Sequence, residues 1–291
     1  MRGFVVLLAA LASLCTGLVP AASGAATSPG TAQHAASSDS GEGSRAEARA
    51  VRHFRGQAFD TCKAPSFQTM RAWRQSSPFR GVGIYFGGRA RHCPNQENLT
   101  PSWVRGVDRM GWRMLPIYVG SQSPCVTSQH KRKTLISSRH PVMQGVQEGR
   151  DAVRRASALG LGRSSALYLD MEMYRWWEHP RCAVTTRHFI QAWNYAVRKN
   201  GYVPGLYSSS NAGIKHMARA RAEGHGSLPH AVWFARWTKK PQVDREPVLP
   251  PGSWYPHRRV HQFEGNTTKT YGGQKIQIDR NAVDAPVAAV P

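Results

Sequence analysis

The chain has 291 residues, of which 41% are hydrophobic, and a formal net charge of +22. This length fits one large domain with an additional N-terminal segment, and the hydrophobic content is enough to bury a core, which excludes a wholly disordered chain. Such a positive charge indicates anionic partners. The longest basic run, Lys131–Lys133, is short and stands without a nucleic-acid-binding motif, so we expect no nucleic-acid partner.

The N-terminal segment has the pattern of a secretory signal peptide. Arg2 supplies a positive charge, residues 4–19 are almost continuously apolar, and small residues follow at 21–26. An uncleaved membrane anchor is the alternative, but the apolar run is short for a spanning helix and no stop-transfer charges follow it. We expect a signal peptide at 1–26, a flexible low-complexity spacer at 27–55, and no stable membrane insertion. A secreted protein with this charge would associate with the anionic polymers of the cell wall.

Four cysteines remain after the signal peptide, and an even number in an exported protein favours two disulfides. Three pairings are possible. No Cys-x-x-Cys spacing is present, and the histidines show no metal-ligand spacing, so we expect neither a metal nor a cofactor. The four residues are Cys62, Cys93, Cys125 and Cys182.

From residue 56 onward, short apolar segments alternate with segments of helical periodicity. The expected helices are Phe67–Gln75, Ser102–Met110, Val142–Leu159, Thr185–Asn200 and Asn211–Ala222. The expected strands are Gly56–Asp60, Gly81–Phe86, Met114–Val119, Ala166–Glu172, Val203–Tyr207, Ala231–Ala235, Arg259–Phe263 and Lys275–Asp279.

This alternation predicts an α/β fold, a single (β/α)8 TIM-like barrel over residues 56–284 with irregular last βα units, followed by a tail at 285–291. A doubly wound open sheet is the alternative fold. A glycine-rich phosphate loop after the first strand would support it, and none is present.

In such a barrel the active site forms at the C-terminal ends of the strands. Polar and aromatic side chains at those ends predict one cleft with four carboxylates and an aromatic lining. A sugar suits this cleft because its apolar faces stack on rings while its hydroxyls form hydrogen bonds. The residues expected there are Asp60, Tyr85, Tyr118, Asp170, Glu172, Tyr207, Trp233, Trp237, Gln262, Asp279 and Asn281.

Asp170 and Glu172 are the candidate catalytic residues. They follow the apolar run Ala-Leu-Tyr-Leu, which argues against a solvated surface, and their spacing places both side chains on one face of a strand. Two close carboxyl groups cannot both ionise freely, so the pKa of one should rise. A carboxylic acid that stays protonated near neutral pH can protonate a glycosidic oxygen. Trp176 and Trp177, just beyond this strand, form either cleft wall or loop core.

The pattern of strand ends resembles glycoside hydrolase family 25, the Chalaropsis-type lysozymes. In that family an Asp ends the first strand, Asp-x-Glu the fourth and Gln the seventh, Trp-x-Ala-x-aromatic marks the sixth, and Asp-x-Asn closes the last. The matching residues here are Asp60, Asp170, Glu172, Gln262, Trp233, Ala235, Trp237, Asp279 and Asn281.

A closer resemblance, over residues 56–284, is to the actinobacterial secreted glycoside-hydrolase-like barrels of the family called domain of unknown function 1906. It is carried by Phe-Asp60-Thr-Cys62, Gly-Ile-Tyr85-Phe-Gly-Gly, Tyr-Leu-Asp170-Met-Glu172-Met-Tyr and Trp233-Phe-Ala-Arg-Trp237. Cys62 stands where the lysozymes usually carry Ser, so the first loop would be remodelled by a disulfide. Alongside this resemblance we expect Cys62 to pair with Cys93, and Cys125 with Cys182. Since all four cysteines follow the first four strands in order, both bridges would brace loops around the cleft.

The resemblance implies a barrel that acts on cell-wall glycan. The leading hypothesis is a secreted, monomeric glycoside hydrolase with Glu172 as general acid. Asp170 would stabilise charge or orient a substrate acetamido group that attacks in place of a protein nucleophile, and Asp60 and Asp279 would bind sugar hydroxyls. A glycan-binding barrel without turnover, held at the wall by its charge, is the alternative. A nucleic-acid binder, the third class, would gather its arginines along one groove.

Overall fold

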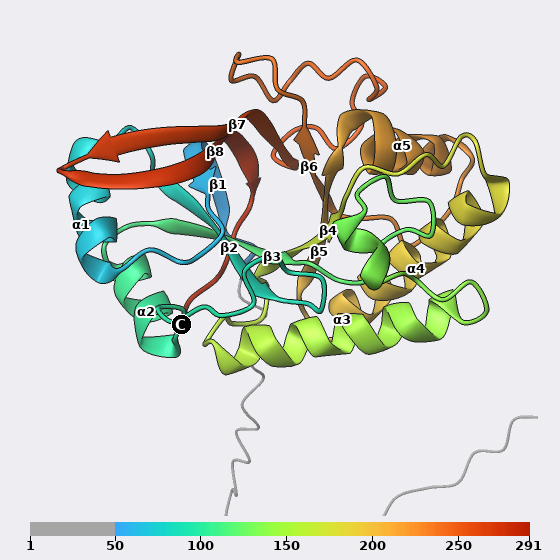
Figure 1. The fold of residues 1–291 in the computed structure, drawn as a ribbon, viewed down its shortest axis with the longest axis horizontal. Coiled ribbons are helices and arrows are strands. Elements are labelled where there is room, and N and C mark those ends of the chain that lie inside the picture. Colours follow the sequence, from blue (N-terminus) through green and yellow to red (C-terminus); the bar gives the residue numbers. More distant parts are fainter. Residues whose placement is uncertain (1–49) are drawn as a thin grey trace, which may run out of the picture. The chain divides into compact units, whose positions relative to one another are not determined.

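The computed structural model describes residues 50–291, so the predicted signal peptide and most of the predicted spacer lie outside the described residues. Eight strands form a closed barrel in chain order (Figure 1). They are β1 (His53–Asp60), β2 (Gly81–Gly87), β3 (Arg113–Tyr118), β4 (Ala166–Met171), β5 (Val203–Ser209), β6 (Ala231–Ala235), β7 (Arg259–Tyr271) and β8 (Gln274–Pro286). The α-helices are α1 (Phe67–Ser76), α2 (Pro101–Arg109), α3 (Pro141–Ala158), α4 (Pro180–Lys199) and α5 (Lys215–Ala222).

The predicted single α/β barrel is thus confirmed, and its irregular part is the final third. Residues 236–258, all of them described, form no helix between β6 and β7. Only Gly272 and Gly273, with φ of 54° and 74°, separate β7 from β8. A parallel crossover needs a dozen or more residues, so this two-residue turn makes a hairpin, and β8 runs antiparallel to both β7 and β1.

The hairpin changes the predicted boundaries of the last strands. From the sequence, the last two strands were expected to end at Phe263 and Asp279. Both β7 and β8 extend well beyond these positions, and the hairpin that joins them reaches α1 (Figure 1). Asp279 is therefore inside β8, where it pairs with Asp60 of β1. The predicted placement of Asp279 beside Asp60 is right, although the expected strand end is wrong.

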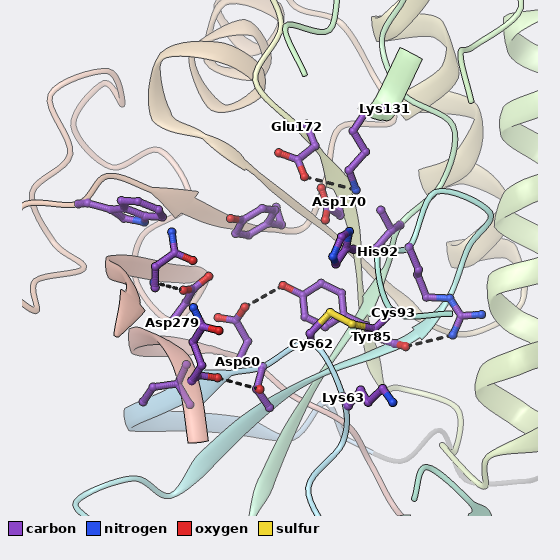
Figure 2. Close-up of a pocket in the computed structure, with 18 residues that line it drawn as sticks. Asp60, Cys62, Lys63, Tyr85, His92, Cys93, Lys131, Asp170, Glu172 and Asp279 are labelled. Carbon is purple, nitrogen blue, oxygen red and sulfur yellow. Dashed lines mark hydrogen bonds and ion pairs between the residues drawn. A yellow bond between two sulfur atoms is a disulfide. The ribbon is translucent and has the colours of Figure 1, made fainter. Parts of the chain in front are cut away.

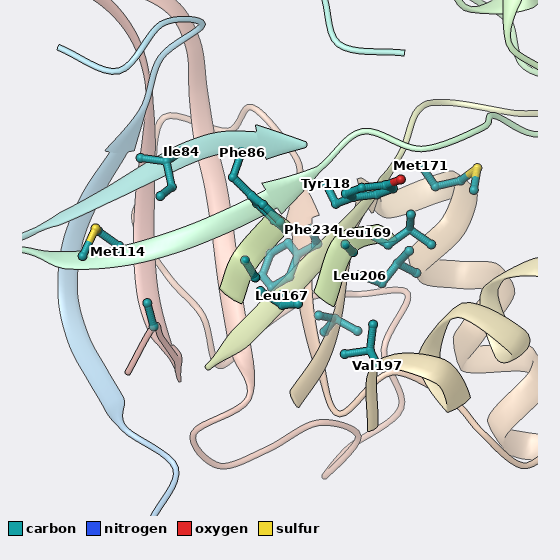
Figure 3. Close-up of a cluster of buried hydrophobic side chains, with 14 of the residues drawn as sticks. Ile84, Phe86, Met114, Tyr118, Leu167, Leu169, Met171, Val197, Leu206 and Phe234 are labelled. Carbon is teal, nitrogen blue, oxygen red and sulfur yellow. The ribbon is translucent and has the colours of Figure 1, made fainter. Parts of the chain in front are cut away.

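Side chains alternate between the barrel interior and the layer of helices, as a strand period of two requires. On β4, Leu167, Leu169 and Met171 pack into the cluster shared with α4 and neighbouring strands (Figure 3). Tyr168 belongs to the separate cluster inside the barrel, and Asp170 shares its face. The buried strand β4 thus carries its carboxyl group on the inner face, at the end where the pocket opens.

Local signals explain most helix boundaries. The Thr100 side chain caps α2 by accepting a hydrogen bond from the Trp103 amide at 3.2 Å, and Pro101 occupies the first turn. The predicted start of α4 at Thr185 is wrong, because the helix begins at Pro180 and Thr185 is buried inside it. None of the described helices is both long and apolar enough to cross a bilayer.

The barrel also includes residues predicted to lie outside it. Strand β1 begins at His53, within the predicted spacer, and β8 continues to Pro286. Val287, Ala288 and Ala289, which follow β8, are buried, and the Ala288 amide donates to the Met114 carbonyl at 2.9 Å. Since Met114 lies near the start of β3, the C-terminal segment covers the barrel end opposite the pocket.

Candidate functional site

The ends of the strands surround a pocket of about 750 Å³ (Figure 2). Its lining includes four carboxyl groups, the disulfide Cys62–Cys93 and several cationic side chains. Figure 2 shows Asp170, Glu172 and Lys131 together on one side, with Asp60 and Asp279 on the other. Seven of the predicted site residues line the pocket, namely Asp60, Tyr85, Asp170, Glu172, Tyr207, Trp237 and Asp279.

Asp60 is buried and fully hydrogen-bonded on its side of the pocket. Its Oδ2 accepts a hydrogen bond from the Tyr85 hydroxyl at 2.8 Å, and its Oδ1 accepts from Asn281 Nδ2 at 2.7 Å. Burial, and then the neighbouring charge of Asp279, raise the pKa of Asp60 to about 7, while the hydrogen bonds oppose the rise. Burial also raises the pKa of Asp279. These two carboxyl groups therefore hold protons more tightly than free aspartates.

Gln262, Asn281 and Trp233 lie beneath the pocket rather than on its surface. Gln262 Oε1 accepts hydrogen bonds from the Tyr207 hydroxyl at 3.0 Å and from Trp237 Nε1 at 3.1 Å. Trp233 Nε1 donates to Asn281 Oδ1 at 2.8 Å. All three side chains are fully buried, so they position the lining groups, whereas the sequence predicted direct contact with a substrate.

Asp170 is the member of the candidate catalytic pair whose pKa is raised. Its side chain is buried, and Oδ1 has no hydrogen-bond partner. Burial, and then repulsion from Glu172, raise its pKa to about 8, and the Lys131 ammonium opposes the rise. Asp170 therefore carries a proton at neutral pH. The expected rise in the pKa of one member of the pair thus falls on Asp170.

Glu172 lies one residue beyond β4 and has a side chain that is 38% exposed. Its Oε1 is 3.4 Å from Lys131 Nζ. The Lys131 ammonium also donates to the Ala90 carbonyl at 2.9 Å and is largely buried, so it is fixed in place. The pair thus consists of a buried carboxyl group of raised pKa and a more accessible carboxyl group.

Gln122 holds the backbone of this pair in place. Its Nε2 donates to the Asp170 carbonyl at 2.9 Å, and its Oε1 accepts from the Glu172 amide at 2.8 Å. The sequence does not predict that Gln122 and Lys131 belong to the site. Both lie in the long loop after β3, and a loop has no periodicity that would show which way a side chain points. The one available signal was a polar segment, Ser121–Ser123, directly after an apolar strand.

Tyr118 is not part of the site. It lies on the outer face of β3, and its hydroxyl donates to Asp151 Oδ2 on α3 at 2.9 Å. The next residue, Val119, faces inward and lines the pocket. Alternation from the buried residues of β3 would have placed Tyr118 outside and Val119 inside.

The disulfides are Cys62–Cys93 and Cys125–Cys182, which is the expected pairing. The first joins the loops after β1 and β2 in the wall of the pocket (Figure 2). The second ties the loop after β3 to the start of α4. Both therefore fix loops at the end of the barrel that carries the carboxyl groups.

The fold and site together define a glycoside-hydrolase-like barrel, with paired carboxyl groups at strand ends in a pocket lined by aromatic rings. Within residues 50–291, no group of three or more His, Cys, Asp or Glu side chains is arranged to hold a metal ion. Residues 71–283 match the family described as Rv2525c-like, glycoside hydrolase-like domain, and the chain belongs to this family. The resemblance seen in the sequence is thereby confirmed.

Solved structures share the fold at low sequence identity. An uncharacterized protein of B. stearothermophilus is 20% identical, with a TM-score of 0.51 over 78% of this chain and 95% of its own. The Tat-secreted protein Rv2525c of Mycobacterium tuberculosis, solved with L-tartrate, is 17% identical, with a TM-score of 0.54 over 79% and 96%. At these identities the likeness extends to the fold alone. No curated protein matches the chain.

Proposed function

We propose that the protein is a secreted glycoside hydrolase that cuts a β-linked amino-sugar polymer of the cell wall, with peptidoglycan as its substrate. The observation that carries this proposal is the Asp170–Glu172 pair, in which a buried carboxyl group of raised pKa adjoins a more accessible carboxylate. Glycoside hydrolysis uses two carboxyl groups that differ in this way. The family description, glycoside hydrolase-like, supports the same class of reaction.

Glu172 acts as the general acid, because its exposed side chain is the one that can reach a glycosidic oxygen. Asp170 holds a proton in the free protein and passes it to the neighbouring Glu172 as substrate enters. The proton then moves from Glu172 to the leaving oxygen as the glycosidic bond breaks, and the water that later adds to the anomeric carbon returns a proton to Glu172. Asp170, now a carboxylate, orients the substrate acetamido group or stabilises the developing positive charge.

The rest of the pocket binds the sugar. The indole of Trp237 is 55% exposed and is oriented by Gln262, so it offers a rigid surface on which a pyranose ring can stack. Asp279 and Tyr207 present oxygen atoms that bind hydroxyl groups.

The two disulfides support secretion, because such bonds persist in oxidising compartments outside the cytosol. The Mycobacterium tuberculosis protein of the same fold is described as Tat-secreted, which supports export here as well. At the wall, the net charge of +22 attracts the acidic polymers that surround the glycan.

The test is to incubate the protein lacking residues 1–26 with purified peptidoglycan and to measure new reducing ends. We expect Glu172→Gln to remove the signal. The control, Glu178→Gln, changes an exposed glutamate of the same loop that is ion-paired with Arg175 and lies outside the pocket lining. Equal signals from wild type and Glu172→Gln would refute the role of Glu172.

A glycan-binding barrel without turnover is the second candidate, and the contact between Lys131 and Glu172 favours it, because the ammonium group occupies a carboxyl oxygen that the proposed acid would need for the glycosidic oxygen. This function predicts no reducing ends from either protein together with retained binding to the wall polymer. Binding that persists as the salt concentration rises would separate glycan recognition from charge attraction alone.

A further inference from the structure

A second aromatic pocket, of about 250 Å³, lies outside the barrel mouth. It is formed by the loop after β4, the first turns of α4, and α5. The side chains that matter for its chemistry are Trp176, Trp177, Arg187, His216, Arg219 and Glu223. None of them belongs to the lining of the barrel pocket.

The inner wall of this pocket is rigid. Trp176 is 7% exposed and stacks on the His216 ring, with centroids 4.7 Å apart and an interplanar angle of 9°. The Arg219 guanidinium lies 5.7 Å from the Trp176 ring centroid, and the Tyr174 hydroxyl is hydrogen-bonded to His216 Nδ1 at 2.9 Å. Burial lowers the pKa of His216 to about 4, so this histidine is neutral at pH 7.

The outer part of the pocket presents groups that can bind a ligand. The Trp177 ring stands at 84° to the Trp176 ring and is 48% exposed, so part of its surface is open to a ligand. The Nε1 of Trp176 is buried and has no hydrogen-bond partner. Arg187, which donates to Gln191 Oε1 at 3.2 Å, and Glu223, which pairs with Arg219 at 2.7 Å, add a charged donor and an acceptor that these partners hold in place. An exposed ring with hydrogen-bonding groups at its edge is chemically suited to a pyranose.

We propose that this pocket is a second glycan-binding subsite, in which one pyranose ring of a polysaccharide stacks on Trp177 and hydrogen-bonds to Arg187 and Glu223. Trp177 is five residues after Glu172, so the two Cα atoms are at most about 18 Å apart. One glycan strand can therefore occupy both pockets. The identity of this glycan as peptidoglycan rests on the proposed function, whereas the stacking chemistry does not.

The experiment measures binding to purified, insoluble peptidoglycan by sedimentation, in enough salt to screen surface charge. All proteins carry Glu172→Gln so that no turnover occurs. We expect Trp177→Ala to raise the Kd about tenfold, the order expected for loss of one aromatic stacking contact. The control is Tyr195→Ala, which removes a ring of similar exposure, 51%, from the outer surface of α4. It should leave the Kd unchanged.

A Trp177→Ala protein that binds as tightly as its parent would overturn the subsite. If Trp177→Ala does not fold, as judged by thermal melting, Arg187→Gln replaces it, and unchanged binding by that variant likewise rejects the proposal. If wild type releases no reducing ends but Trp177→Ala still weakens binding, the hydrolase function fails and the subsite stands. If wild type releases reducing ends and Trp177→Ala binds normally, the subsite alone is wrong. If the parent protein does not bind peptidoglycan, the subsite fails for this glycan.

Discussion

Replacing Asp170 by Asn tests the raised pKa through stability, without requiring any enzymatic activity. The native state retains a proton on Asp170 up to about pH 8, whereas an unfolded aspartate releases it near its ordinary pKa of 3.8. Between these values the native state binds one more proton than the unfolded state, so the free energy of unfolding falls as pH rises. Because asparagine cannot ionise, the unfolding free energy of the variant should not fall with pH for this reason.

The magnitude of the fall in wild type follows from the two pKa values. Each pH unit between them corresponds to about 1.4 kcal/mol, so wild type should lose about 4 kcal/mol between pH 4 and pH 7 relative to Asp170→Asn. Any constant effect of the amide on packing cancels when the two pH values are compared.

The assay is urea denaturation of wild type and Asp170→Asn at pH 4, 5, 6 and 7 with the disulfides intact. The variant should gain stability over wild type progressively as pH rises. Asp151→Asn is a suitable control, because its hydrogen bond with Arg155 lowers the pKa of Asp151, opposite in direction to Asp170. Stability curves for wild type and Asp170→Asn that stay parallel from pH 4 to pH 7 would refute the inferred protonation of Asp170.

Three further outcomes are expected. Lys131→Met should raise the pKa of Asp170 still further, because it removes the positive charge that opposes the rise, and a carboxyl ¹³C NMR titration with an unchanged midpoint would contradict this. Replacing Cys62 and Cys93 by Ser should cost about 4 kcal/mol of unfolding free energy for a loop of 31 residues, measured by urea denaturation, and a loss below about 1 kcal/mol would contradict it. Tyr118→Phe should cost about 1 kcal/mol of stability and leave peptidoglycan binding unchanged, whereas weakened binding would return Tyr118 to the site.

The sequence was informative where a strand is short and buried. On β4 and β6 the apolar runs mark the strands, and the residues that end such runs in a barrel lie at its mouth, so the positions of Asp170 and Trp237 near the pocket could be predicted. Tyr118 was wrongly assigned to the cleft because it ends a strand. The alternation of side chains along β3, which places Tyr118 on the outer face, was not taken into account. An aromatic residue at a strand end is as readily packed under a helix as exposed in a pocket.

Two other features depend on tertiary contacts that one sequence does not encode locally. The pair of glycines at 272 and 273 marks a tight turn, but the antiparallel closure of β8 on β1 depends on pairing over residues far apart in the chain. The hydrogen bonds of Gln122 to the backbone of β4, and the contact of the buried Lys131 with Glu172, depend on where a long loop packs against β4. Loops of this kind have no periodicity from which a facing direction can be derived.

The antiparallel closure explains how one pocket holds four carboxyl groups. Because β8 runs against β1, Asp279 comes to lie opposite Asp60, while Asp170 and Glu172 share the end of β4. Tyr85 connects the two groups, since it donates to Asp60 and its pKa is raised by burial and by the charges of both Asp60 and Asp170. Each side of the pocket therefore contains an aspartate of raised pKa, but only Asp170 has an unpartnered oxygen. Asp60 is already satisfied by its neighbours, which leaves Asp170 as the carboxyl group whose proton is available for chemistry.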